Sequence, residues 1–254
     1  MDISLAFYVT AVCAVLITGI SKSGFGGGLG VMAVPLMSLF AAPQFAAAVM
    51  MPILIAMDVL IVVRYRKSWN RSVVLALLPG AMVGLALGGL LFETLEADVV
   101  RFAIGIMALV FVTQYVLQLR AGRTASPRFP RPVVWGLAAT SGFASYIAHA
   151  GGPPVKGYLL AQGMEKSAFV GTNTVFFFAL NGIKTVAYGT TGTMDWDSVS
   201  VSLFLAPWLL VGVFVGGWLH SRVDQTVFVR LVYVFLALTA VRLLSDSVPK
   251  LFLV

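Results

Sequence analysis

The stretch that decides the fold is Lys22-Ser23-Gly24-Phe25-Gly26-Gly27-Gly28-Leu29-Gly30, a glycine-rich break between two apolar runs. A second break, His149-Ala150-Gly151-Gly152-Pro153-Pro154, lies in the other half of the chain. Each break is followed by a short apolar segment, at 29–42 and 153–162. A straight helix of that length does not easily cross a hydrocarbon core of about 30 Å. The sequence therefore predicts two short or re-entrant membrane segments, one in each half.

Composition sets the class of protein around these breaks. Of the 254 residues, 59% are hydrophobic and 11% are charged, and the mean hydropathy is +0.97. A soluble domain carries about 25% charged residues, so most of the exterior must face lipid. The apolar runs are long and unbroken, without the alternation of membrane barrels. We predict an all-α polytopic membrane protein with about 8–10 membrane segments, and its lipid bilayer is its first partner.

Ten apolar segments are visible. They cover residues 3–20, 29–42, 44–63, 73–92, 99–119, 133–148, 153–162, 167–190, 199–219 and 227–244.

The two halves resemble each other. Ser23-Gly24-Phe25 recurs as Ser141-Gly142-Phe143 at an offset of 118. A longer match at an offset of 128 pairs Pro79, Val83, Gly84, Gly88, Gly89 and Leu91 with Pro207, Val211, Gly212, Gly216, Gly217 and Leu219. Six identities at one offset predict an internal duplication. The expected organisation is a first membrane repeat at 1–122, a basic cytoplasmic linker at 123–132 and a second membrane repeat at 133–254.

Loop charges predict that the repeats are inverted. Basic residues follow the third segment (Arg64, Arg66, Lys67, Arg71) and occur throughout the linker. The loop between these two basic regions is acidic. Basic loops face the cytoplasm. The second-half loop equivalent to the Arg64 loop holds Asp195 and Asp197 and no basic residue. Inversion needs an odd number of crossings per half, either five or three plus a hairpin, and both place the termini in the periplasm.

Paired breaks predict where a substrate binds. Inverted-repeat transporters bind substrate at the midplane, where interrupted helices of both halves meet. Backbone N–H groups at Gly24, Phe25, Gly26, Gly27 and Gly28, facing those at Gly151 and Gly152, are expected to cradle an anion. The alternative is that these glycines serve close helix packing.

Ionisable residues inside apolar segments are costly and usually functional. The five candidates are Lys22, Asp58, His149, Lys156 and Lys184. Four of them are cationic or can become so, which favours an anionic substrate over a cation.

Lys184 is the strongest candidate, because Asn181 lies one turn earlier on the same helix face. Together they offer an oxyanion a charge and an amide donor; the alternative for Lys184 is snorkelling to the interface. His149 lies at the second break and can donate to substrate or carry a proton, unless it is a hydrogen-bonded packing residue.

The other candidates are weaker. Lys22 and Lys156 either line the breaks or snorkel to a surface. Asp58 precedes the Arg64 cluster, so a local ion pair or structural role is favoured over a coupling proton. Thr172 and Asn173 either cap a helix or line the pathway.

Several function classes lack support in the sequence. The two histidines and single cysteine, Cys13, form no metal-ligand cluster and no disulfide within the chain, and no nucleotide-binding motif or nucleophile–base set stands out. Tyr188 lies near a predicted span end and is expected to anchor the interface. We therefore expect no enzyme, no cofactor and no nucleic-acid partner, and leave a homo-oligomer open.

The motifs also resemble a known family. The first break, from Gly19 through Gly28 to Val34-Pro35, resembles the opening of the sulfite exporter TauE/SafE family. The second break, with Phe169-Val170-Gly171-Thr172 and Asn181-Gly182-Ile183-Lys184, looks like that family's second half. The resemblance implies a bacterial inner-membrane permease for sulfite, sulfoacetate, another organosulfonate or thiosulfate, usually described with eight spans in four-helix repeats.

The predicted function is a secondary transporter for a small sulfur-containing oxyanion, working by alternating access. Three alternatives remain open at this point: a small-anion channel, a membrane partner subunit that does not transport, and a cation carrier that uses Asp58.

Overall fold

The computed structural model describes residues 4–24, 30–121, 129–219, 222 and 224–252, and in this part of the chain every regular element is a helix. The elements are α1 (Leu5–Gly24), the 3-10 helix η1 (Gly30–Met32), α2 (Ala33–Met37), α3 (Pro43–Tyr65), α4 (Arg71–Thr94), α5 (Ala97–Ala121), α6 (Arg131–Ala148), α7 (Gly152–Ala161), α8 (Lys166–Thr191), α9 (Trp196–Leu219) and α10 (Gln225–Phe252).

The helices correspond closely to the predicted apolar segments, and the all-α membrane class is confirmed. Among the described residues, six helices are long and apolar enough to cross a membrane, namely α1, α3, α4, α5, α9 and α10. Helices α6 and α8, with 18 and 26 residues, are not among these six. They are also the helices that supply much of the candidate site described below.

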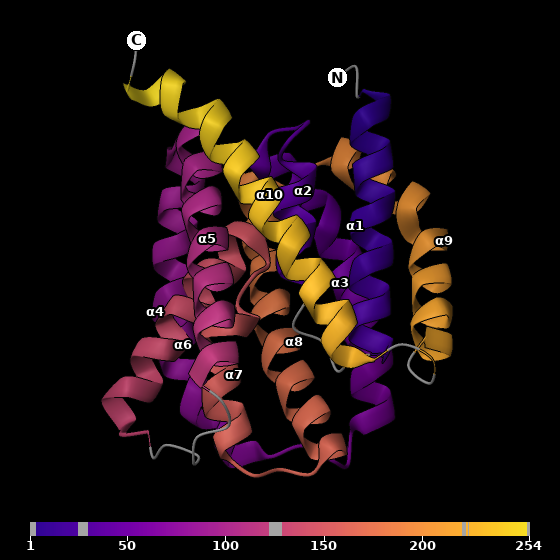
Figure 1. The fold of residues 1–254 in the computed structure, drawn as a ribbon, viewed down its shortest axis with the longest axis vertical. Coiled ribbons are helices and arrows are strands. Elements are labelled where there is room, and N and C mark those ends of the chain that lie inside the picture. Colours follow the sequence, from indigo (N-terminus) through magenta and orange to yellow (C-terminus); the bar gives the residue numbers. More distant parts are fainter. Residues whose placement is uncertain (1–3, 25–29, 122–128, 220–221, 223, 253–254) are drawn as a thin grey trace.

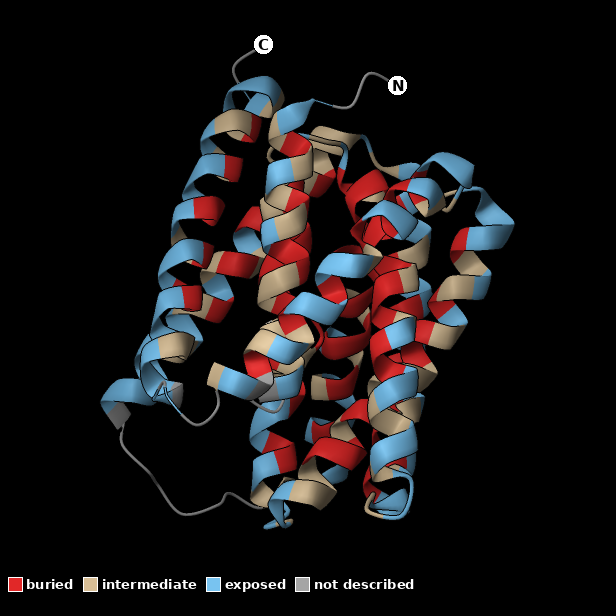
Figure 2. Cartoon of the chain, turned by 90° about the vertical axis from the view of Figure 1, so that its right-hand side faces the viewer, coloured by how far each residue is buried: buried red, intermediate tan, exposed pale blue. Residues whose placement is uncertain are grey.

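Burial follows the pattern expected of a protein in lipid. Buried residues gather in the middle of the helix bundle and exposed residues lie on its periphery (Figure 2). Large apolar side chains are exposed on the outer helices, including Leu75 at 62%, Leu90 at 68% and Phe214 at 78%. Apolar side chains are stable at such positions when their surroundings are hydrocarbon.

Contacts define one end of the bundle, which we call the termini side because both chain termini lie there (Figure 1). The amide of Gln44, at the start of α3, donates to the Leu95 carbonyl, just after α4, at 3.3 Å. Lys250, near the end of α10, pairs with Asp98 at the start of α5 at 3.3 Å. The termini side therefore gathers the starts of α1, α3 and α5 and the ends of α4 and α10.

The opposite end, which we call the arginine side, carries the basic loop at 66–70 (Figure 1). The backbone N–H of Asn70 donates to Thr172 Oγ1, early in α8, at 2.8 Å. Phe129, just before α6, packs edge-on against Tyr158 of α7 at 5.9 Å between ring centroids. Helices α6 and α8 therefore start on the side opposite to α1 and α3.

The course of the chain gives each half a hairpin and three further long helices. In the first half, α1 runs from the termini side and the segment 30–42 returns toward it, since Arg101 of α5 donates to the carbonyls of Ser38 and Ala41 at 3.1 and 3.0 Å. In the second half, α6 runs from the arginine side and α7 returns. Helix α7 has 10 residues and α2 has five, about 15 Å and 8 Å of helix, so neither crosses the membrane.

This course matches one of the two predicted odd-crossing arrangements, a hairpin plus three long helices in each half, and the inversion of the repeats stays a prediction. Helices in equivalent positions run in opposite directions. Both halves also share one order of lengths: long, short, long, long, long. The duplication itself and the repeat boundaries stay predictions, supported by this order.

The repeated glycines make close contacts between helices. A Cβ atom on Gly84 of α4 would overlap the Ala139 carbonyl of α6, and one on Gly216 of α9 would overlap Ser23 Oγ of α1. Glycine is required at these positions because a larger residue would push the backbones apart. The matching glycines thus serve the same purpose in two helix pairs, α4 with α6 and α1 with α9.

The first glycine break starts later than predicted. Lys22, Ser23 and Gly24 continue α1 as helix. Ser23 Oγ lies 2.8 Å from the Gly19 carbonyl of its own helix and 3.0 Å from the Val213 carbonyl of α9, and its single O–H can donate to either. Phe25, Gly26, Gly27 and Gly28, predicted to cradle substrate, lie outside the described residues.

Candidate functional site

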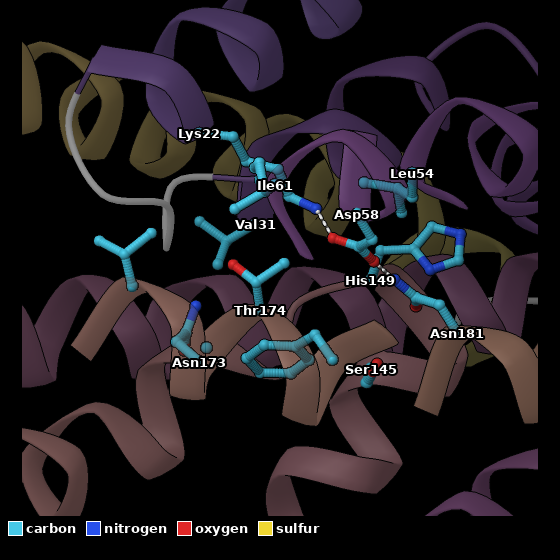
Figure 3. Close-up of a pocket in the computed structure, with 14 residues that line it drawn as sticks. Lys22, Val31, Leu54, Asp58, Ile61, Ser145, His149, Asn173, Thr174 and Asn181 are labelled. Atoms are coloured by element: carbon cyan, nitrogen blue, oxygen red, sulfur yellow. Dashed lines mark hydrogen bonds and ion pairs between the residues drawn. The ribbon is translucent and has the colours of Figure 1, made fainter. Parts of the chain in front are cut away.

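Charged and polar side chains from α1, α3, α6 and α8 meet around one pocket (Figure 3). Lys22 lies near the end of α1, and His149 is the residue that caps the end of α6. Asp58 lies on α3, and Asn181 and Lys184 lie on α8. Five candidates drawn from distant parts of the sequence therefore form one cluster.

Asp58 is the anionic centre of the cluster. It is fully buried, with an exposed fraction of 0%. Lys22 Nζ lies 2.5 Å from Oδ1, and Asn181 Nδ2 donates to Oδ2 at 2.6 Å. Figure 3 shows Asp58 held between the two donors. A buried carboxylate needs such partners, because an unpaired charge in a low dielectric is very costly.

Lys184 is the second fully buried ionisable residue of the cluster, with an exposed fraction of 0%. Its ammonium group donates to the Ser145 carbonyl at 2.8 Å and to Ser145 Oγ at 3.1 Å, and it lies 2.8 Å from His149 Nδ1. The lysine thus faces the last turn of α6, where the helix dipole favours a positive charge, and it shares the Ser145 carbonyl with the backbone N–H of His149.

The contacts of His149 select one tautomer. Its Nε2 lies 2.9 Å from the Ala47 carbonyl, which can only accept, so Nε2 carries the proton. Its Nδ1 faces Lys184, and a protonated lysine can only donate, so Nδ1 accepts. His149 is therefore a neutral imidazole between two helices. It is also the one non-glycine residue with positive φ in the described chain, at 51°, which turns the backbone out of α6.

A cavity of about 60 Å³ adjoins this cluster. Such a space holds a small ion or a few water molecules. The residues that line it are Lys22, Gly30, Val31, Leu54, Asp58, Ile61, Ser145, His149, Gly152, Val170, Asn173, Thr174, Phe177 and Asn181. The lining of α8 runs from Asn181 back to Val170, so the cavity extends from the cluster toward the arginine side.

Three aromatic rings fill the space toward the termini side, and we call them the aromatic cluster: Phe92, Tyr146 and Tyr188. Their centroids lie 5.1–5.9 Å apart. The Tyr188 hydroxyl donates to the Tyr146 carbonyl at 2.6 Å, and the Tyr146 hydroxyl donates to Glu93 at 2.9 Å. Tyr188 is fully buried, so its predicted role as an interface anchor is wrong.

The second break shapes the backbone beside the cavity. Gly152 begins α7 and lines the cavity, but Pro153 and Pro154 have no N–H to donate. Gly151 accepts from Ser141 Oγ at 2.6 Å, and a Cβ atom on it would lie 2.6 Å from the Ser141 carbonyl. Gly151 therefore serves the close approach of α7 to α6, and the role of the Gly151 and Gly152 N–H groups in holding an anion stays a prediction.

The structure separates the remaining candidates. Asn173 lines the cavity as predicted. Thr172 does not: its hydroxyl accepts from Asn70 and lies 3.5 Å from Met164 Sδ, so it ties α8 to the loop at 66–70. Lys156 is exposed on α7 and lies outside the cavity lining.

The predicted local ion pair between Asp58 and the Arg64 cluster is wrong. Asp58 pairs across the bundle with Lys22, 36 positions earlier in the chain. Residues i and i+6 lie on different faces of a helix, so Asp58 is buried in the interior while Arg64 is exposed. Sequence reasoning missed Ser145 and Thr174, since serine and threonine occur often in membrane helices as packing residues; the one available signal was that Ser145 precedes His149 by one turn.

The site has no features of a metal centre in the part of the chain that the structure describes. No group of three His, Cys, Asp or Glu side chains lies close enough together to hold a metal ion. Two lysines instead face one carboxylate and several neutral donors.

A buried charged cluster beside a cavity, held between broken and continuous membrane helices, defines the class: a multi-pass membrane protein built to move a polar solute. The family model described as sulfite exporter TauE/SafE matches residues 11–243, nearly the whole chain. The chain belongs to the sulfite exporter TauE/SafE family, whose members are membrane transporters rather than enzymes. No curated protein and no solved structure matches the chain.

Proposed function

We propose that this protein is a secondary transporter for a small sulfur-containing oxyanion, such as sulfite, sulfoacetate or another organosulfonate, and that it works by alternating access. The termini side would face the periplasm, and the membrane would be the bacterial inner membrane. The basic loop at 66–70 lies at the opposite end, which supports this orientation.

The observation that carries the proposal is the donor set around the cavity. Lys22 lines the cavity and Lys184 lies directly behind Ser145 and His149, while Asn181 and Asn173 add amide groups. An anionic sulfur centre has several oxygens that accept hydrogen bonds, and donors on different helices can reach them together. A cation would find a single carboxylate here, already paired with Lys22.

Two features support alternating access. The cavity extends toward the arginine side, and the aromatic cluster fills the bundle on the termini side. This arrangement corresponds to an inward-facing state, because the path to the proposed periplasmic side is blocked by packed rings. Opening that path requires the rings to separate while the cavity closes, through motion of one half against the other.

The energy for export needs no nucleotide. Expelling one negative charge across a potential of about −100 mV gains about 2.3 kcal/mol. A monovalent anion that crosses without a coupled proton can therefore leave the cell even when its outside concentration is roughly fifty times its inside concentration.

The first experiment is a thermal-shift screen of the purified protein against sulfite, thiosulfate, sulfoacetate, taurine and sulfate. We expect at least one sulfur oxyanion to stabilise the protein and chloride at equal ionic strength to do nothing. The matched variants are Lys184→Met and Lys156→Met, which remove the same charge from the buried site and from an exposed position.

The expected result is loss of the ligand-induced shift in Lys184→Met and its retention in Lys156→Met. Equal loss in both, or stabilisation by unrelated ligands alone, would sink the sulfur-oxyanion proposal. Uptake of labelled ligand into proteoliposomes then separates carrier from channel: a carrier saturates and is stimulated by unlabelled ligand on the opposite side, and a channel is not.

A further inference from the structure

We propose that Asp58 is the proton-binding group of the transporter: it takes up a proton when the anion binds, and the proton crosses the membrane with the anion. This inference rests on the proposed function, since it assigns a second transported ion to the same site.

Asp58 occupies the donors that an anion needs. Its Oδ1 holds Lys22 Nζ at 2.5 Å and its Oδ2 holds Asn181 Nδ2 at 2.6 Å. Both donors line the cavity. With Asp58 ionised, the site already contains an anion, bound as the protein's own side chain. A substrate oxyanion and the Asp58 carboxylate therefore compete for the same two groups.

Electrostatic repulsion prevents an ionised Asp58 carboxylate and a bound oxyanion from occupying the site together. An oxyanion bound to Lys22 in this cavity would lie within a few ångströms of the Asp58 carboxylate. Like charges at that distance in a low-dielectric site repel strongly, and one of two such carboxylate-like groups is driven to protonate. A proton on Asp58 removes the repulsion and weakens its hold on Lys22, so the lysine becomes available to the substrate.

Asp58 can retain its place when protonated. A neutral carboxylic acid keeps a carbonyl oxygen that accepts from Asn181 and gains an O–H donor that can serve the bound anion. Since Asp58 lines the cavity, water in the cavity can deliver the proton to it.

The other titratable groups that face this point are less suited. Lys22 from α1 and Lys184 from α8 are the cations that the anion requires. His149 from α6 has both ring nitrogens engaged, Nε2 with Ala47 and Nδ1 with Lys184, so a second ring proton would point at an ammonium group. Among the described residues that line the cavity, Asp58 is the one carboxylate.

Proton and anion binding are then reciprocally coupled. If the anion binds only when Asp58 is protonated, its affinity rises about tenfold for each unit by which the pH falls, for as long as the free protein is ionised at Asp58. Between about pH 8 and about pH 6 the affinity should therefore rise up to ~100-fold. A sulfonate with one negative charge would cross as an electroneutral pair with its proton.

The experiment measures protons directly. Thiosulfate and sulfoacetate do not titrate near neutral pH, whereas sulfite does and would confuse the count. Calorimetric titration of the full-length protein with each of these two, in two buffers of different ionisation enthalpy, gives the number of protons taken up per anion. We expect a value approaching one at about pH 8 and a matching pH dependence of affinity.

The Asp58→Asn variant carries a permanent neutral mimic of the protonated side chain. It should bind the same anion with no proton uptake and with an affinity that no longer depends on pH. Asp246→Asn is the matched control, because its carboxylate pairs with Arg242 at 3.2 Å on the surface and should leave the proton count unchanged.

The outcomes separate this inference from the proposed function. Anion binding by the wild type without proton uptake overturns the role of Asp58 and leaves the transporter proposal standing. Proton uptake that is undiminished in Asp58→Asn, or that is lost only in His149→Asn, has the same consequence. If none of the sulfur oxyanions binds the wild type, the proposed function fails and takes the inference with it. If Asp58→Asn does not fold, the wild-type proton count alone decides.

Discussion

The ion pair between Lys22 and Asp58 joins α1 to α3 at the centre of the bundle, and its removal tests whether the cluster is a coupled unit. The Lys22 side chain is 17% exposed and that of Asp58 is 0% exposed. Replacing Lys22 by Met leaves a buried carboxylate without its charge partner. Breaking a buried pair from one side typically costs about 3–5 kcal/mol, so we expect a loss of unfolding free energy in that range.

Replacing the other partner, Asp58, should lower the free energy of unfolding by less. In Asp58→Asn the amide oxygen still accepts from Asn181, and the flexible Lys22 stem can move its ammonium group into the cavity. We expect a loss of about 1–2 kcal/mol, in line with one charged hydrogen bond. In the double variant no charge is left unpaired. Its loss should be smaller than the sum of the single losses by about 1–3 kcal/mol.

The measurement is reversible unfolding of the four proteins in mixed detergent micelles, followed by circular dichroism at a fixed pH. The surface pair of Lys250 and Asp98, at 3.3 Å with side chains 58% and 29% exposed, supplies the matched cycle. Its coupling should be about 0–1 kcal/mol, because exposed ion pairs contribute little. If the central cycle is additive within about 0.5 kcal/mol, the two charges are not a unit and the reasoning about competition for donors is refuted.

Three further predictions use other parts of the structure. Gly84→Ala should lower the free energy of unfolding by about 1–3 kcal/mol or prevent folding, since its methyl group overlaps a backbone carbonyl of α6, whereas Gly136→Ala, with open space around it, should be neutral or stabilising in the same unfolding assay. Tyr188→Phe removes a hydroxyl donor from the aromatic cluster and should cost about 1 kcal/mol and speed anion exchange in proteoliposomes; an unchanged exchange rate would argue against that cluster as a gate. A hydrogen bond from the Ser198 N–H holds the pKa of Asp195, in the loop before α9, below its usual 3.8. Asp195→Ala should therefore lower the free energy of unfolding by about 0.5–2 kcal/mol at neutral pH. When the unfolding free energy is measured at decreasing pH, the difference from the wild type should fade as the pH falls below 3.8 and through the lowered pKa.

Much of the architecture follows from the sequence because the bilayer is a demanding solvent. Long apolar runs have to become helices, since a backbone group in hydrocarbon must find its hydrogen bond within its own segment. The helix bounds therefore track the predicted segments, and α7, Gly152–Ala161, differs from the predicted 153–162 by one residue at each end. The charges of the loops, read with the same logic, indicated which ends of the bundle lie together.

The candidate site was predictable in its members but not in its contacts. An ionisable residue in an apolar helix is rare enough to be noticed, so Lys22, Asp58, His149 and Lys184 were all identified. Which of them pair is a long-range property. Asp58 could pair with a nearby arginine by sequence distance, and helix geometry instead turns it toward Lys22 on another helix.

The sequence by itself determined that this chain is a helical membrane protein with a broken segment in each half, because hydropathy and glycine content act locally. Only the tertiary structure decided that the broken segments are hairpins, that glycines such as Gly84 pack one helix onto another, and that Thr172 lies away from the cavity. The physical reason is that these features depend on which helix faces which. That choice is made by packing between residues more than a hundred positions apart, such as Asn181 and Asp58.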